Sequence, residues 1–176
     1  MCYYFMERKS GKMSFRRIVD YSKGDDLTSF WIFYSRQVNA KSRIGRIFWT
    51  YLMNRSAHRH GGYIGAGALI SEIPMLPHGI HGIYISRFAS VGSDCCIYQN
   101  VTIGEVNRKA PKIGNHCLIG AGAVLIGDIR IGNDVKIGAG AVVHTNVPDG
   151  SIVVPAESRI IQKAITVGEA QKRWQE

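Results

Sequence analysis

Residues 113–143 read IGNHCLIGAGAVLIGDIRIGNDVKIGAGAVV, and an apolar residue returns in them at every sixth position. The same step runs through most of residues 76–153, where the recurring residues are Ile85, Val91, Ile97, Ile103, Ile113, Ile119, Leu125, Ile131, Ile137 and Val143. A period of six fits neither an α-helix, which needs about 3.6 residues per turn, nor a half-buried strand, which needs about two. It is typical of a parallel β-helix, in which each hexapeptide forms one short strand and one turn. Three hexapeptides would then close one triangular coil.

A second inward position is expected four residues after each recurring apolar residue. Small or β-branched side chains occupy it, namely Ala89, Cys95, Val101, Cys117, Ala123, Ile129, Val135, Ala141 and Val147. Since the chain has no CxxC pair, we expect Cys95 and Cys117 to be reduced core residues rather than metal ligands or disulfide partners. Cys96, the next residue, should point outward. The turns hold Gly, Asn and Asp, which tolerate the positive φ angles that tight turns require.

Two insertions interrupt the six-residue step. Leu76 and Ile85 are nine positions apart, and Ile103 and Ile113 are ten apart. The first insertion lies in LPHGIHGI (76–83) and the second forms EVNRKAPK (105–112). Insertions in a solenoid map to loops on one face and often mark the binding face. We therefore expect these two loops to frame the functional site.

The basic charge of the chain is concentrated before the repeat. Residues 1–62 hold twelve Lys and Arg against four acids, whereas residues 63–176 hold ten against nine. Apolar residues at helical spacing predict helices over 26–38 and 41–58, the first capped by Asp25 or Asp26. We expect this basic helical segment, 1–60, to cap the open end of the solenoid. Its alternative use is peripheral contact with an anionic membrane surface, or attraction of a phosphorylated substrate.

Composition limits the classes of function further. The chain has no apolar run of about 18 residues and no signal-peptide h-region, so we expect a cytoplasmic protein, with the inner face of the membrane as a second location. No nucleic-acid recognition motif accompanies the positive charge, and nucleic acid is therefore not expected as a partner.

Three motifs carry a resemblance to a known family: NVTIG (100–104), KIGNHCLIGAGAVLIGDIRIGNDVKIGAGAVV (112–143) and the VP that follows at 147–148. Together they resemble the left-handed β-helix acyltransferases, in the branch that contains serine acetyltransferases and the O-acetyltransferases of capsule and exopolysaccharide gene clusters. The resemblance implies a left-handed β-helix over 61–161, and we expect a helix over 162–176. It also implies a homotrimer that uses acetyl-CoA as acyl donor and requires no metal.

The resemblance also implies catalytic roles for two residues. The family base lies in x-H-x-x-G-I-V-I, which PHGIHGIYI (77–85) matches with one extra residue, so His78 is the expected general base. His81 is the alternative, and two purely structural histidines are the third possibility. The glycine of NVTIG, Gly104, is expected to offer its N–H to the oxyanion of the tetrahedral intermediate. Its competing interpretation is structural, because most hexapeptides carry Gly at that place.

Acetyl-CoA is expected in a groove between neighbouring β-helices. The resemblance implies contacts at Ala121, Ala139 and Thr145, with Arg159 near the nucleotide phosphates. Lys109 and Arg108 in the second loop are alternative phosphate partners. Each of these positions has a competing interpretation as a turn residue without a ligand.

The acceptor is where this chain departs from serine acetyltransferases. Serine acetyltransferases carry an Asp directly before the catalytic base, where this chain has Pro77. They pair the base with a second Asp, where this chain has Tyr63, and they carry a His in the active-site loop, where this chain has Ala110. Binding free serine requires partners for both of its charges. We therefore expect a sugar hydroxyl of a surface or capsular polysaccharide, or of its precursor, as the acceptor. Serine O-acetylation in cysteine biosynthesis is one alternative and a non-catalytic scaffold is another; Glu72 or a backbone carbonyl is expected to orient the base.

Overall fold

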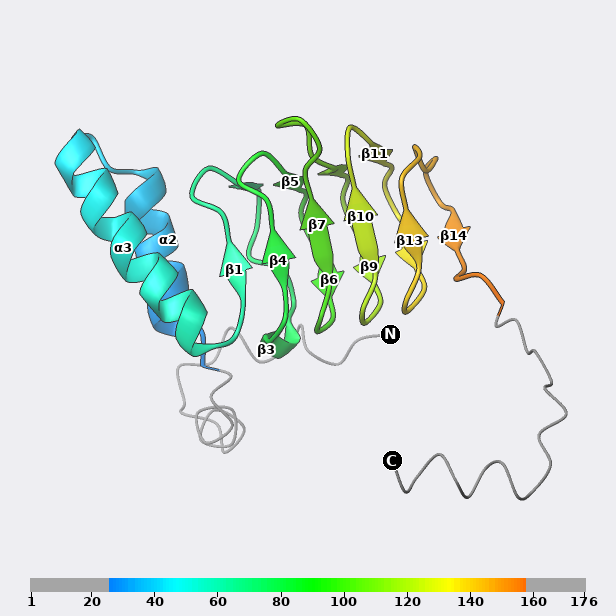
Figure 1. Cartoon of the computed structure of the whole chain (residues 1–176), viewed down its shortest axis with the longest axis horizontal. Helices are drawn as coiled ribbons and strands as arrows, with labels where there is room; N and C mark the ends of the chain where they lie inside the picture. Colours follow the sequence, from blue (N-terminus) through cyan, green and yellow to red (C-terminus); the bar gives the residue numbers. More distant parts are fainter. Residues whose placement is uncertain (1–25, 158–176) are drawn as a thin grey trace, which may run out of the picture.

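The computed structural model describes residues 26–157, in which the six-residue period produces fourteen short strands (Figure 1). The strands are β1 (Tyr63–Ile64), β2 (Leu69–Ile70), β3 (Pro77–Ile80), β4 (Tyr84–Ile85), β5 (Ser90–Val91), β6 (Cys96–Ile97), β7 (Thr102–Gly104), β8 (Lys112–Ile113), β9 (Leu118–Ile119), β10 (Val124–Ile126), β11 (Arg130–Ile131), β12 (Lys136–Ile137), β13 (Val142–Val143) and β14 (Ile152–Val153). The expected helix over 162–176 and Arg159 lie outside the described residues.

Strands from successive coils pair in parallel and form three flat sides. Side A is β1-β4-β7-β10-β13, side B is β2-β5-β8-β11, and side C is β6-β9-β12-β14. Pairing is in register, so Ile85 lies beside Ile103, Ile103 beside Leu125, and Leu125 beside Val143. These residues form a buried column along the axis, as the six-residue period predicts. The expected parallel β-helix is therefore confirmed.

The second inward position is confirmed as well. Cys95 and Cys117 are buried free thiols, and each approaches a backbone carbonyl oxygen of the next coil, Gly114 O at 3.3 Å and Gly132 O at 3.1 Å. The hydrogen bond with Cys117, followed by burial, raises the pKa of the Cys95 thiol, which keeps it protonated. Cys96 lies half-buried on the outer surface of side C. The cysteines thus act as small apolar residues of the core.

Asparagine and aspartate side chains tie successive coils together at the turns between sides B and C. The backbone N–H groups of Ser93, Asn115 and Asn133 each donate a 2.9 Å hydrogen bond to a side-chain oxygen one coil further along, on Asn115, Asn133 and Asp149 respectively. Each turn therefore satisfies a donor of the turn before it. This ladder is the structural reason for the Asn and Asp of the repeat.

Two helices cover the first coil, as the sequence predicts. They are α2 (Thr28–Val38) and α3 (Arg43–Arg59), which pack on each other beside β1 (Figure 1). Asp26 accepts a 3.0 Å hydrogen bond from the N–H of Thr28 at the start of α2, and the hydroxyl of Ser42 accepts one from Gly45 N at the start of α3. Neither helix has the length and apolarity that crossing a membrane demands, as far as residues 26–157 are concerned.

A tyrosine of α2 closes the open edge of β2. The hydroxyl of Tyr34 donates to the carbonyl oxygen of Ala68 at 2.8 Å and accepts from the N–H of Ile70 at 3.2 Å. Burial raises the pKa of this hydroxyl, and the hydrogen bond from Ile70 opposes the shift. Since β2 is the first strand of side B, its outer edge has no strand partner, and unpaired edge groups are costly unless they are covered.

Replacing Tyr34 with Phe should therefore destabilise the fold. The Tyr34→Phe variant keeps the ring but leaves Ala68 O and Ile70 N without their partner, at a cost of about 1–3 kcal/mol. Urea unfolding measures the change in free energy. Tyr51→Phe is the matched control, because Tyr51 is 63% exposed and its change should stay within about 0.5 kcal/mol. Equal losses in the two variants would contradict the assigned capping role.

Candidate active site

The residues expected to act in catalysis and cofactor binding occupy two corners of the coil. His78 lies in β3, before the turn that leads from side C into side A, and we call this the CA corner. Ala121 and Ala139 lie at the same corner on later coils. The turns stack directly, because Gly122 N donates to Gln99 O at 3.0 Å and Gly140 N to Ala121 O at 2.8 Å. Asn100 N donates in the same way to His81 O at 3.0 Å, so the row along the coil axis consists of His81, Gln99, Ala121 and Ala139, and His78 lies three residues before it at the same corner.

The remaining described residues of the expected site lie at the corner between sides A and B, the AB corner. Gly104 ends β7, Lys109 belongs to the loop that follows it, and Thr145 follows β13 on a later coil. The structure thus separates the expected base from the expected oxyanion donor by the width of side A. One chain alone does not bring His78 and Gly104 together.

His78 and His81 face different parts of the molecule, although both are exposed. The ring of His78 lies 6.2 Å from the ring of Tyr98 on the next coil, between centroids. A methyl group placed on Gly61 would lie 3.7 Å from Nδ1 of His81, so His81 is on the side of the helical cap. Both histidines therefore lie at the CA corner, the ring of His78 toward the next coil at Tyr98 and the ring of His81 toward Gly61.

Gly104 differs from the other glycines of the repeat. A Cβ on Gly120 would lie 2.6 Å from Ala139 N, and one on Gly114 would lie 2.6 Å from Gly132 O, so the next coil forbids a side chain at both. At Gly104 the nearest atom would be Cγ1 of Ile126 at 3.5 Å, an ordinary contact, and φ is not positive. Packing therefore does not require Gly at 104, which weakens its purely structural interpretation.

The second insertion is a tight hairpin rather than a wide loop. Val106 and Lys109 exchange two backbone hydrogen bonds, of 2.9 and 3.0 Å. The two residues between them, Asn107 and Arg108, have φ angles of 53° and 64°, which match the type I′ turn typical of two-residue hairpins. The hairpin therefore projects from the AB corner in a defined shape.

Charged side chains at the AB corner are paired with each other. Nζ of Lys109 lies 2.7 Å from Oδ2 of Asp128, and this hydrogen bond raises the pKa of Lys109 and lowers that of Asp128. The hydroxyl of Ser86 donates to the carboxylate of Glu105, directly after Gly104. Neither pairing was anticipated from the sequence, because the partners lie 19 residues apart on successive coils. The signal that could have predicted both pairings is the length of one coil, about 18 residues, because residues one coil apart lie side by side.

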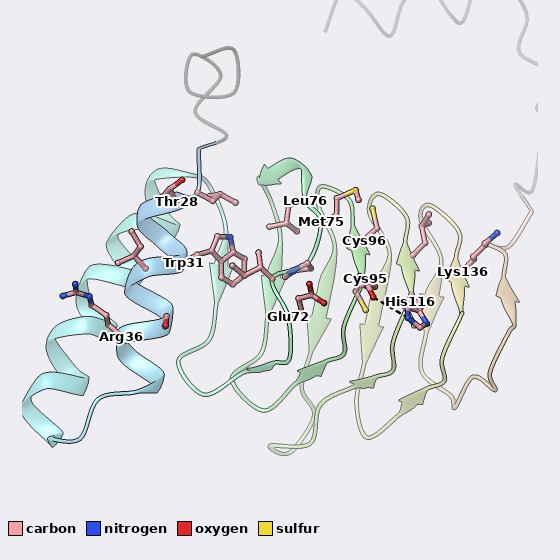
Figure 2. A pocket seen from close by; sticks show the side chains of 18 residues that line it. Thr28, Trp31, Arg36, Glu72, Met75, Leu76, Cys95, Cys96, His116 and Lys136 are labelled. Carbon is pink, nitrogen blue, oxygen red and sulfur yellow. Dashed lines mark ion pairs between the residues drawn. The ribbon is translucent and has the colours of Figure 1, made fainter. Parts of the chain in front are cut away.

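A large groove lies elsewhere, between α2 and side C (Figure 2). Its volume is about 1090 Å³, and Trp31, Met75 and Leu118 are among its lining residues, whereas His78 and Gly104 are not. Glu72 also lines the groove. Glu72 lies before side C of the first coil and His78 lies after it. That Glu72 or a backbone carbonyl orients the base stays a prediction.

Comparison with known proteins identifies the repeat. A family model described as "Bacterial transferase hexapeptide (six repeats)" matches residues 110–145. Among curated relatives, the serine acetyltransferase of Synechococcus elongatus is 38% identical over 105 residues, covering 57% of this chain and 43% of that protein. The serine acetyltransferase of Staphylococcus aureus strain Mu50 is 38% identical over 111 residues, covering 60% and 52%. The chain thus spans about half the length of these relatives.

Solved structures agree with the sequence relatives. Serine acetyltransferase from Brucella abortus strain S19 superposes with a TM-score of 0.69 at 29% identity, covering 88% of this chain and 63% of that one. The Neisseria gonorrhoeae serine acetyltransferase in complex with serine gives a TM-score of 0.66 at 29% identity, with the same coverage. The resemblance to left-handed β-helix acyltransferases and the expected fold class are thereby confirmed.

Gly104→Ala separates a packing role from a functional one. The variant should unfold at the same urea concentration as the parent chain, because the new methyl group meets only ordinary contacts. If the acyl donor approaches this backbone, the same methyl group should lower the rate of the expected acetyl transfer, by about 10- to 100-fold for a displacement near 1 Å. Gly120→Ala is the control, and it should lose stability instead. Full activity in Gly104→Ala would remove Gly104 from the site.

Proposed function

We propose that this chain, whose β-helix belongs to the serine acetyltransferase-like branch of the left-handed β-helix acyltransferases, transfers an acetyl group from acetyl-CoA to a hydroxyl group. The observation that carries the proposal is the exposed His78, which lies beside Tyr98 at the same corner of the coil as Ala121 and Ala139. The names of the relatives, all serine acetyltransferases, support the same chemistry.

His78 supplies base catalysis in this proposal. Its imidazole takes the proton of the acceptor hydroxyl while the acceptor oxygen attacks the thioester carbonyl carbon. The N–H of Gly104 stabilises the oxyanion of the tetrahedral intermediate. The intermediate then collapses, the C–S bond breaks, and the imidazolium of His78 returns the proton to the departing thiolate. The products are the acetyl ester and free coenzyme A.

A homotrimer brings the two corners together. Side A separates His78 from Gly104 in one chain, so the CA corner of one chain must face the AB corner of a neighbour, and a threefold axis closes such a heterologous contact. The outer surface of side A has no charged residue, since its outward residues are Tyr63, Tyr84, Thr102, Gly104, Val124, Ile126 and Val142. Acetyl-CoA would lie between neighbouring β-helices, against Ala121 and Ala139 of one chain, with Thr145, Lys109 and Arg159 as further contacts.

As the acceptor we propose serine, which the sequence alone offered as an alternative to a sugar. Every relative named above is a serine acetyltransferase, which supports serine better than the polysaccharide acceptor. One set of observations favours a sugar hydroxyl as second candidate, namely Tyr63, Pro77 and Ala110 at positions where serine acetyltransferases carry charged or titratable groups. Glu105 at the AB corner offers a carboxylate that a serine ammonium group could contact across the trimer interface.

Release of free thiol from acetyl-CoA, measured against a panel of acceptors, tests the function. L-serine and a set of neutral sugars and sugar nucleotides are compared at equal concentration, and we expect serine to accelerate thiol release most. Acceleration by a sugar but not by serine would reverse the acceptor assignment. Absence of any acceptor-dependent release would support a non-catalytic scaffold.

His78→Ala should reduce turnover strongly and leave the acyl donor bound. Because a general base contributes about 10²–10⁴ in rate, kcat should fall by that factor while the KM for acetyl-CoA changes little. His81→Ala should cost far less, since His81 faces the helical cap. His58→Ala, at an exposed position of α3, is the control for removing a histidine. A larger loss in His81→Ala than in His78→Ala would transfer the role to His81.

A further inference from the structure

The outer face of α3 is apolar and exposed. Ile44, Ile47, Phe48 and Tyr51 are 82%, 62%, 53% and 63% exposed, and their spacing places them on one face of the helix. The opposite face packs against the rest of the protein through Met53 and Ala57, which are buried. A helix that is apolar on both faces is normally covered on both. The outer face of α3, which we call the α3 stripe, therefore calls for a partner.

The charge around the α3 stripe limits what that partner can be. Residues 26–62 contain Arg36, Lys41, Arg43, Arg46, Arg55 and Arg59 but a single acid, Asp26, which caps α2 through Thr28 N. Residues 1–25 add six further basic residues against three acids. Two copies of so basic a surface repel each other, so a second copy of this chain is a poor match. An apolar surface surrounded by cations is complementary to a bilayer that carries anionic headgroups.

The position of α3 suits such a partner. Figure 1 shows both helices at the β1 end of the solenoid, away from β14. The two corners that carry His78 and Gly104 run along the solenoid and not across its helical end. Contact through α3 would therefore leave both corners accessible. In the trimer proposed above, three copies of the stripe would lie at the same end and bind with combined strength.

We propose that the α3 stripe, with Arg43, Arg55 and Arg59 beside it, docks on the surface of an anionic lipid bilayer. The helix lies in the interface, with its apolar residues among the headgroups and upper acyl chains and its arginine stems extended toward the phosphates. Docking through the α3 stripe determines where the protein works, and it does not depend on which acceptor the protein uses. It also gives a physical form to the peripheral membrane contact that the sequence suggested as an alternative to capping.

Vesicle sedimentation with the full-length chain tests the proposal. Vesicles of phosphatidylcholine with about one third phosphatidylglycerol are compared with pure phosphatidylcholine. We expect binding to the anionic vesicles only, weakened by added salt because the charges are exposed. The double variant Ile47→Glu/Phe48→Glu should lose binding at least tenfold, and Arg43→Gln should lose about fivefold. Ile152→Glu is the matched control, since Ile152 is 69% exposed at the opposite end of the solenoid and its change should have no effect.

Two further measurements distinguish this proposal from others. Both variants should keep the turnover of a soluble acceptor and the unfolding midpoint of the parent chain, because Ile47 and Phe48 are exposed. A chain lacking residues 1–24 should still bind anionic vesicles. The proposal is overturned if the parent chain binds no vesicles, if it binds both kinds equally, or if only the deletion removes binding. A changed sedimentation coefficient in Ile47→Glu/Phe48→Glu would instead make the stripe a contact between copies of this chain.

Discussion

The fold depends on parallel, in-register stacking of coils that are one strand spacing apart. Ile103 lies between Ile85 and Leu125 because the strands of side A pair without any offset. Adjacent coils are then so close that a methyl group at Gly114 or Gly120 would lie 2.6 Å from backbone atoms of the next coil. Every other feature follows from this spacing, since a residue repeated at the same place in each coil becomes a row along the axis. Rows of Ile form the core, and rows of Asn and Asp connect the turns.

The same stacking leaves an open strand edge at the first coil, and the two helices cover it. Tyr34 of α2 satisfies one donor and one acceptor of this edge through a single hydroxyl. Phe30 of α2 and Met53 and Ala57 of α3 extend the apolar core beyond the first coil. Covering the edge uses one face of α3 and leaves its other apolar face exposed. Capping therefore accounts for the buried face of this helix, with Met53 and Ala57, but not for its exposed apolar face.

Rows along the axis also organise the candidate site. His78, Ala121 and Ala139 share one corner because the chain turns there once per coil, while Gly104 and the 105–110 hairpin occupy another. The hairpin is held by its own hydrogen bonds, and Lys109 is held by Asp128. Coil geometry and these hydrogen bonds therefore fix the positions of the site residues. A rigid triangular prism presents its corners outward, and so a site that combines two corners is naturally shared between neighbouring chains.

The sequence by itself determined the solenoid, its core and its helical cap, because these follow from local periodicity. A period of six predicts the strands, the inward cysteines and the insertions, and helical spacing predicts α2 and α3 to within a few residues. Motifs such as NVTIG added the resemblance to the left-handed β-helix acyltransferases. Only the tertiary structure decided which residues meet. It showed that Lys109 is held by Asp128, and that Gly104 is free of the packing constraint that forbids a side chain at Gly114 and Gly120. The reason is that such contacts join residues one coil apart: the coil length indicates which positions come near each other, but the stacking of the coils decides which side chains meet there.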